Sequence, residues 1–136
     1  MTKPSPQVLR FLLLGGLAAA VNWGVRFPLS MVMPFPAAVA CAYAIGMTVG
    51  FTLYRKYVFP GGGRPLAQQA TMFVAINSVT AVLVMFVAIA LVAAPPLEPL
   101  PLSVREAFAH GFAIALGAAC NFFGHKLLTF VEVAPR

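Results

Sequence analysis

The chain is 136 residues long; 61% of its residues are hydrophobic and only 9% are charged. A soluble domain of this length has about a quarter of its residues charged, so this chain has too little polar surface to cover a water-exposed fold. Its nine Lys and Arg against three acids would suit nucleic acid only as one basic face on a soluble scaffold. The cations lie instead at the ends of apolar segments. We therefore expect a membrane protein and no nucleic-acid partner.

Four apolar segments are long enough to cross a bilayer, which takes about 20 residues of helix. We expect spans over about residues 9–33, 35–57, 68–94 and 103–129. Proline- and glycine-rich breakers separate them: MPFP at 33–36, PGGGRP at 60–65 and PPLEPLPLS at 95–103. Open strands would leave amides unsatisfied in lipid, and four strands cannot close a barrel. The sequence thus predicts an all-α integral membrane four-helix bundle.

The first span contains Arg26, a cation inside the apolar run VNWGVRF at 21–27. Arg26 follows Arg10 by about 24 Å at the helical rise of 1.5 Å per residue, which places it in the outer part of the membrane core. Its stem can extend to the outer headgroups, or its guanidinium can face the bundle interior, where ionisable side chains usually line a substrate path. Asn22 lies one turn earlier on the same face. A guanidinium beside an amide suits phosphate and hydroxyl groups.

The second span matches the fourth when it is shifted by 71 positions. Each has a small residue at every fourth position, then a cation, then Phe; chance similarity of alanine-rich helices is the alternative. Spacing by four puts small residues on one helix face, where another backbone can approach closely. The two stripes are Ala38, Ala42, Gly46, Gly50 and Ala109, Ala113, Gly117, Asn121. We therefore expect two helical hairpins that run in the same direction and are related by an axis along the membrane normal.

Polar side chains in the later spans have two interpretations each. Asn77 in the third span and Asn121 in the fourth either form interhelical hydrogen bonds, as membrane amides commonly do, or contact a sugar. The repeat-related Arg55 and Lys126 meet anionic headgroups at the membrane surface in either case. A shared role in capturing a lipid phosphate is their second interpretation.

Orientation follows from the distribution of the cations. Seven of them lie on one side of the predicted bundle: Lys3, Arg10, Arg55, Lys56, Arg64, Lys126 and Arg136. Arg26 and Arg105 lie towards the other side. The positive-inside tendency then places both termini in the cytoplasm. Residues 1–7 and 132–136 are expected to be cytoplasmic tails, with one transmembrane domain over 8–131.

Nothing in the sequence indicates catalysis. There is no Gly-rich phosphate loop, metal-ligand spacing or nucleophile–base set, so we expect no enzyme activity, no metal and no cofactor. Cys41 and Cys120 lie in apolar segments, which indicates small packing residues. No Asp or Glu lies in the apolar cores of the spans, since Glu106 is at the outer start of the fourth. This argues against an exporter of hydrophobic cations, because cation exchange needs a negative counter-charge.

Three stretches taken together resemble the GtrA-like family: RFLLLGGLAAAVNWGVRFPL (10–29), AYAIGMTVGFTLYRKYVF (42–59) and ALGAACNFFGHKLLTF (115–130). These are small four-helix membrane proteins of bacterial cell-envelope glycosylation. Their helices two and four usually end in N-F-x-x-N-[RK]-x-x-x-F. In the second ending of this chain, Gly124 and His125 replace the more usual polar pair. In the first, Gly50 and Tyr54 stand where asparagines are common.

The resemblance implies a flippase: a translocase of polyprenyl-phosphate-linked monosaccharide across the bacterial inner membrane for cell-envelope polysaccharide. Its alternative is a non-transporting anchor or accessory subunit of a polyprenyl-phosphate glycosyltransferase. The implied partners are the lipid-linked sugar, membrane lipids and a second copy of the chain, since four short helices enclose little space. The candidate substrate-binding residues are Asn22, Arg26, Arg55, Asn77, Asn121 and Lys126. The candidate helix-packing residues are Ala42, Gly46, Gly50, Ala113 and Gly117.

Overall fold

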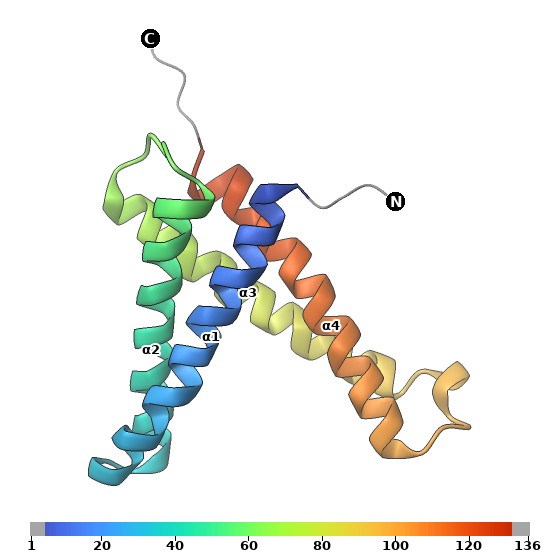
Figure 1. Ribbon diagram of the computed structural model, residues 1–136. Helices are drawn as coiled ribbons and strands as arrows, with labels where there is room; N and C mark the ends of the chain where they lie inside the picture. The colour runs from blue at the N-terminus through green and yellow to red at the C-terminus, as the bar shows by residue number, and fades with distance from the viewer. Residues whose placement is uncertain (1–4, 132–136) are drawn as a thin grey trace. The chain divides into compact units, whose positions relative to one another are not determined.

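The computed structural model describes residues 5–131, apart from the side chains of Phe35 and Pro36. Within that range the chain contains helices and connecting segments, and no strand. Four helices are long and apolar enough to cross a membrane (Figure 1): α1 (Pro6–Val32), α2 (Phe35–Leu53), α3 (Leu66–Val92) and α4 (Leu102–Gly124). The predicted all-α class with four membrane-length helices is confirmed.

Local sequence explains where the helices begin. The hydroxyl of Ser5 accepts a hydrogen bond from the backbone N–H of Val8 at 3.4 Å and so caps α1. Pro6 follows at the first helical position, where its missing N–H would have had no partner. Gly61 has φ of +93° in the segment before α3, a conformation that glycine adopts without a steric penalty. A short 3₁₀ turn, η2 (Pro95–Leu97), lies between α3 and α4.

Both α2 and α4 continue into a widened turn of five residues. These π-helical turns are η1 (Tyr54–Val58) and η3 (His125–Thr129). The N–H of Phe59 donates to the carbonyl of Tyr54, five residues back, at 2.8 Å. The two turns lie 71 positions apart, which is the shift that aligns the second span with the fourth. π-Helical turns are rare and occur frequently at functional sites.

The described residues form two compact units, and the first contains residues 5–70 with 130–131. In this unit α1 packs against α2, which runs back alongside it (Figure 1). The small stripe of α2 is buried in this contact. A Cβ atom on Gly46 would lie 2.6 Å from the Cβ of Asn22 and 3.3 Å from the carbonyl oxygen of Ala18. The close approach of the two helices therefore requires glycine at this position.

Aromatic rings surround the η1 end of the first unit. The ring of Phe11 of α1 packs against that of Tyr54 in a tilted arrangement, with 4.7 Å between ring centroids. Phe59 stacks on Phe130 at 5.2 Å. The side-chain amide of Gln7 donates to the carbonyl of Val58 at 3.0 Å, which satisfies a backbone acceptor of the widened turn.

The second unit contains Thr71–Thr129 and has the same small-residue packing. The stripe residues Ala109, Ala113 and Gly117 of α4 are buried. A Cβ atom on Gly117 would collide with a methyl group of Val84 on α3. At the far end of the pair, Arg105 donates from both Nε and Nη2 to the carbonyl of Val92, so it caps the last turn of α3.

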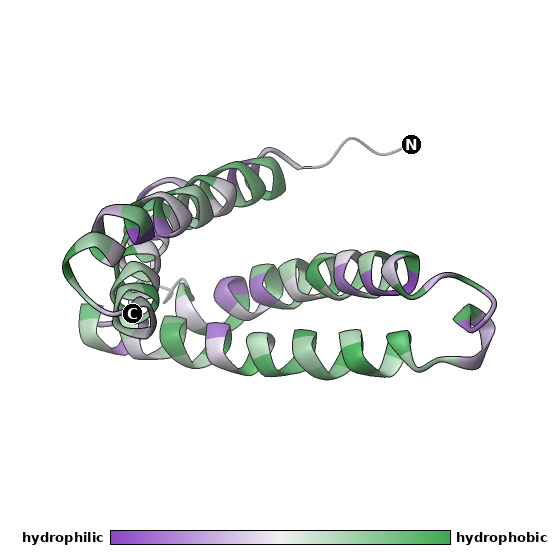
Figure 2. Ribbon diagram, turned by 90° about the horizontal axis from the view of Figure 1, so that it is seen from below, coloured by the Kyte–Doolittle hydropathy of each residue, from purple (hydrophilic) through white to green (hydrophobic). Residues whose placement is uncertain are grey.

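Large apolar side chains are exposed along all four helices. Met31 is 86% exposed and Val79 is 69% exposed, values that are unusual for such residues in water. Figure 2 shows hydrophobic residues along the length of each helix, with few hydrophilic ones between them. This surface fits a multi-pass protein whose helices contact lipid.

Candidate functional site

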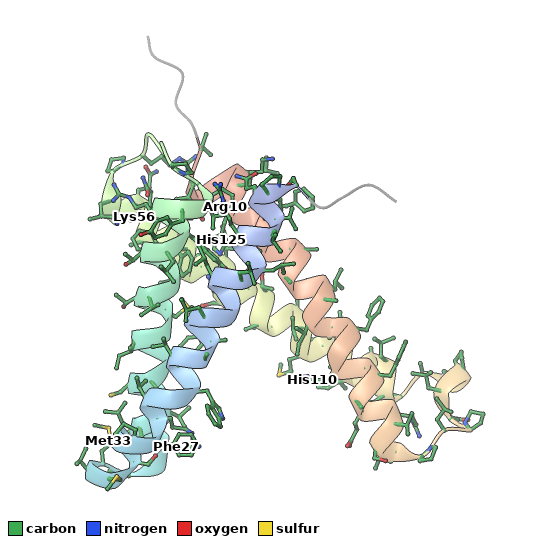
Figure 3. All side chains as sticks on the ribbon, viewed as in Figure 1. Arg10, Phe27, Met33, Lys56, His110 and His125 are labelled. Carbon is green, nitrogen blue, oxygen red and sulfur yellow. The ribbon has the colours of Figure 1, made fainter. Side chains whose placement is uncertain are left out.

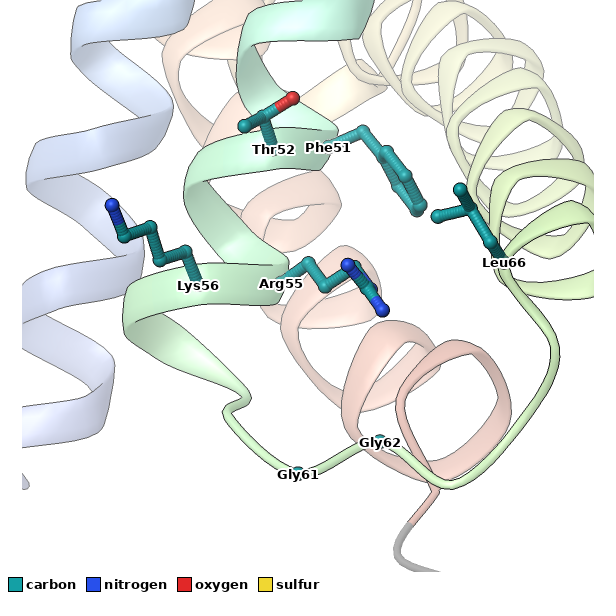
Figure 4. A pocket seen from close by; sticks show the side chains of 7 residues that line it. All are labelled: Phe51, Thr52, Arg55, Lys56, Gly61, Gly62 and Leu66. Atoms are coloured by element: carbon teal, nitrogen blue, oxygen red, sulfur yellow. The ribbon is translucent and has the colours of Figure 1, made fainter.

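A pocket of about 530 Å³ lies beside η1 in the first unit. Figure 4 shows its lining side chains. It is lined by Phe51, Thr52, Arg55, Lys56, Gly61, Gly62 and Leu66. The walls thus combine aromatic and aliphatic groups with cations and with the backbone of the glycine-rich segment.

Gln69 holds Arg55 in one orientation. The Nε of Arg55 donates to Oε1 of Gln69 at 3.1 Å. The Nε2 of Gln69 donates to the carbonyls of Gly62 at 3.1 Å and Arg64 at 2.7 Å. Gln69 is completely buried, and each of its polar atoms is paired, as a buried amide requires. Gln69 therefore joins the guanidinium to the segment that forms one wall of the pocket.

The terminal nitrogens of Arg55 are available to a ligand. Within residues 5–131 its one hydrogen bond uses Nε, and its side chain is exposed. A guanidinium held in this way presents a planar pair of donors that matches the oxygens of a phosphate or carboxylate. Figure 4 shows Arg55 on the side of Phe51 and Leu66, whereas Lys56 projects to the opposite side of the turn. The pocket thus places an anion-binding group next to apolar walls.

Asn22 and Arg26 lie elsewhere in the first unit. Arg26 follows Phe11, the ring that contacts η1, by about 22 Å along the helix axis, so the structure does not bring it together with Arg55. Its guanidinium carbon lies 4.2 Å from the ring centroid of Phe27, and Asn22 packs against Gly46. Figure 3 shows Phe27 and Lys56 at opposite ends of the helix pair.

Asn77 and Asn121 meet in the second unit, together with two residues that the sequence interpretation had not selected. Nδ2 of Asn77 donates to the carbonyl of Phe73 at 2.8 Å and to Nε2 of His125 at 3.2 Å. Oδ1 of Asn77 accepts from Nδ2 of Asn121 at 3.4 Å. Nδ1 of His125 lies 3.1 Å from the hydroxyl of Thr129, so the tautomer with its proton on Nδ1 satisfies both contacts.

This polar cluster is enclosed in the helix pair. His125 and Thr129 are completely buried, and the ring of His125 stacks on Phe73 at 4.5 Å. Oδ1 of Asn121 is buried and accepts no hydrogen bond. The arrangement offers neutral donors and acceptors, which are the groups that bind hydroxyls without binding phosphate strongly.

Lys126 has different surroundings from its repeat partner Arg55. It is exposed, and its ammonium lies 5.8 Å from the ring centroid of Phe122 on the preceding turn. Among the described residues, no amide holds its side chain as Gln69 holds Arg55. Lys126 therefore resembles a mobile interfacial cation more than part of a formed pocket.

Gln69 and His125 are the main residues that sequence reasoning did not select. Gln69 follows Gln68 at the start of an apolar helix, and only the structure shows that Gln68 is exposed while Gln69 is buried. His125 had one signal, since the 71-residue shift aligns it with Tyr54. That alignment marks both residues as the first positions of the two π-helical turns.

Comparison with known proteins gives one match. A family model described as GtrA/DPMS, transmembrane domain, matches residues 10–130. The match includes most of α1, the whole of the three later helices and both widened turns. Neither the curated proteins nor the solved structures contain a significant match.

Proposed function

The chain belongs to the GtrA/DPMS transmembrane-domain family, and from that premise we propose that it translocates a polyprenyl-phosphate-linked monosaccharide across the bacterial inner membrane. The sugar is then used to glycosylate a cell-envelope polysaccharide. In this proposal the protein makes and breaks no covalent bond. It lowers the barrier for a phosphate and a group of hydroxyls to pass hydrocarbon.

The observation that carries the proposal is the pocket beside η1. Burial of Gln69 and its hydrogen bond to Arg55 leave two terminal nitrogens of the guanidinium for a phosphate. Phe51 and Leu66 line the same pocket and provide an apolar wall for the first isoprene units of the tail. A lipid phosphate needs both features side by side.

The proposed topology has both termini in the cytoplasm and two hairpins of the same direction. Repetition of the widened turn after 71 residues supports the duplication. The cations near both turns support a cytoplasmic position for these ends, because positively charged segments remain on that side. The Arg55 pocket then opens towards the leaflet in which such lipids are made.

The other candidate residues act later in this scheme. Along α1, Asn22 lies about 16 Å and Arg26 about 22 Å from the η1 end, and they receive the phosphate near the outer surface. Asn77 and Asn121 belong to the neutral cluster that contacts sugar hydroxyls. Lys126 adds a second cation for capture. A homodimer, formed through the exposed apolar helices, encloses the polar path.

Reconstitution tests the proposal. The full chain is placed in liposomes with a radiolabelled polyprenyl-phosphate monosaccharide, and exposure of the sugar is followed with a membrane-impermeant oxidant. We expect Arg55→Gln to lower the initial rate at least tenfold, since a charge-assisted pair with phosphate contributes about 1.5–3 kcal/mol. Arg55→Lys keeps the charge but not the planar fork, so its rate should fall between the two.

The matched control is Arg64→Gln. This variant removes a cation from the same segment, but the side chain of Arg64 does not line the pocket, and its backbone carbonyl still accepts from Gln69. It should translocate like the wild type. Wild-type liposomes that match empty liposomes would contradict translocation and leave the accessory role beside a glycosyltransferase as the function of the chain.

A further inference from the structure

A second pocket lies on the other side of the same widened turn. Its volume is about 560 Å³. It is lined by Arg10, Leu13, Leu14, Lys56, Tyr57 and Pro60. Figure 3 shows Arg10 and Lys56 at the same end of the first unit. Only Lys56 is shared with the Arg55 pocket.

The charge of this second pocket is entirely positive. Arg10 comes from α1 and Lys56 from η1, and no acidic side chain of residues 5–131 lines the pocket. Lys56 projects away from Arg55 (Figure 4), and its ammonium lies 5.1 Å from the ring centroid of Tyr57. Unlike Arg55, neither cation is held by a hydrogen bond within the described residues. Because their side chains can change rotamer, these two cations can adjust to phosphate esters with different substituents.

The apolar part of the pocket points to the rest of the ligand. Leu13 and Leu14 follow Arg10 by about one helical turn, towards the middle of α1. Leu13 is 64% exposed, so it offers its side chain to a ligand as well as to bulk lipid. Tyr57, an aromatic residue of the type enriched at membrane interfaces, is 46% exposed. Along α1, the cation Arg10 lies nearer the helix end and the leucines lie further inwards, an order that matches a phospholipid read from headgroup to acyl chain.

We propose that this second pocket is a binding site for an anionic phospholipid, separate from the Arg55 pocket. Arg10 and Lys56 contact its phosphate, and Leu13 and Leu14 contact the upper part of its acyl chains. Free inorganic phosphate has the same anionic group but gains nothing from the leucines. The proposal does not depend on translocation, because the pocket exists whether or not a sugar lipid crosses.

Native mass spectrometry of the detergent-purified full chain tests the site. The protein is titrated with phosphatidylglycerol and with phosphatidylcholine of identical acyl chains. We expect Arg10→Gln to weaken phosphatidylglycerol binding about fivefold, the usual contribution of one interfacial cation. Arg10→Gln combined with Lys56→Gln should weaken it further, and phosphatidylcholine binding should not change. Arg10→Gln is the cleaner variant because Arg10 does not line the Arg55 pocket.

Two further measurements keep the test decisive. Leu13→Ser changes an exposed side chain that the fold does not need, and it should weaken phosphatidylglycerol binding while the unfolding temperature stays the same. Inorganic phosphate at millimolar concentration should not displace the lipid. Unchanged phosphatidylglycerol affinity in the double variant, equal binding of phosphatidylcholine, or displacement by inorganic phosphate would each overturn the proposal.

Discussion

Within each helix pair, α1 with α2 and α3 with α4, the two helices contact each other at corresponding positions. The ring of Phe11 packs against that of Tyr54, tilted, at 4.7 Å in the first pair. In the second, Phe73 stacks on His125 at 4.5 Å. Phe73 follows Phe11 by 62 positions, and His125 follows Tyr54 by 71. The pairs therefore share a packing register, although the loops inside them differ in length.

The contacts of the glycines further along the helices also correspond between the two pairs. Gly46 faces Ala18 and Asn22 in the first pair. Gly117 faces Thr80 and Val84, which occupy the matching positions of the second pair. A shared register of small residues and widened turns is thus combined with different side chains on the first helix of each pair.

The polar groups make the difference between the two pairs. Gly15 leaves room for the hydroxyl of Tyr54 in the first pair. At the matching position of the second, Asn77 bonds to His125. The first pair has Arg10, Arg55 and Lys56 in pockets at its η1 end, and the second has a neutral cluster buried inside. One packing scheme is thus combined with two different sets of polar groups.

Changing the contact glycines should have the largest effect on this comparison. Gly46→Ala is expected to lower the free energy of unfolding by about 2–3 kcal/mol, because the added methyl group meets the backbone of α1. Gly117→Ala should cost about 1 kcal/mol less, since it meets methyl groups of Val84 and Thr80 that can turn away. Denaturant titration in detergent measures both.

Gly24→Ala is the control for both glycine variants. A Cβ atom there meets nothing within 4 Å, so alanine should be neutral or stabilise the helix by up to about 1 kcal/mol. An equal loss of stability at Gly24 would show that glycine is needed in these helices for a reason other than close contact.

The matching glutamines provide the second prediction. Gln69 follows Gln7 by 62 positions; it is fully buried and forms three hydrogen bonds, whereas Gln7 forms one. Gln69→Leu leaves two carbonyls and Arg55 without their partner, so it should cost about 2 kcal/mol. Gln7→Leu should cost about 0.5–1 kcal/mol.

Arg55 also makes the glutamine comparison a test of function. Gln69→Leu should lower the translocation rate at temperatures well below its unfolding transition, because the guanidinium loses its orientation. Gln7→Leu should not lower it. If the two variants translocate equally, Gln69 supports the fold without positioning Arg55.

The third prediction concerns the neutral cluster. His125→Phe keeps a ring that stacks on Phe73 but removes the acceptor for Asn77 and the partner of Thr129. We expect a loss of about 1 kcal/mol, the usual size of an interhelical hydrogen bond in a membrane. With Asn77→Leu added, the total loss should be smaller than the sum of the two single losses. A double-mutant cycle by thermal unfolding would contradict the cluster if the two changes were additive.

The smallest expected effect is a coupling in the first pair. Gly15→Ala places a methyl group against the hydroxyl of Tyr54, and Tyr54→Phe removes that hydroxyl. The two changes together should therefore cost less than their sum, by about 0.5–1 kcal/mol. Additive losses in the same unfolding assay would mean that the ring moves aside freely.

Hydropathy was sufficient to predict the four helices, because an apolar run of bilayer length has helix as its one satisfied backbone state. The small stripes were also readable: Gly46 and Gly117 lie where the neighbouring helix comes closest. The widened turns could not be predicted, because one extra residue in a turn does not change the hydrophobic pattern of an apolar run. The partner of Arg55 could not be predicted either. Gln68 and Gln69 are the same residue type, and they differ only in the burial of their side chains.

Only some of the candidate residues that were chosen for their chemistry lie close together in the structure. Asn77 and Asn121 were selected as polar side chains in lipid, and the structure joins them through a 3.4 Å contact. Arg26 and Arg55 were selected for their charge, yet they lie far apart along the same helix pair. Residue type identifies a group that can bind, whereas its neighbours depend on helix register and on the turn that precedes it.

The widened turn η1 constrains the number of residues in the segment around it. Each step of four residues overshoots a full α-helical turn by about 40°, so a row at that spacing winds slowly away from its neighbour. The extra residue in the widened turn η1 offsets this drift. The row of buried side chains therefore continues to Tyr54 and Val58. Deleting one residue between Gly50 and Arg55 would rotate the following side chains by about 100° about the helix axis and turn Arg55 away from Gln69. The number of residues between Gly50 and Gly61 is therefore a constraint on this protein in addition to their identity.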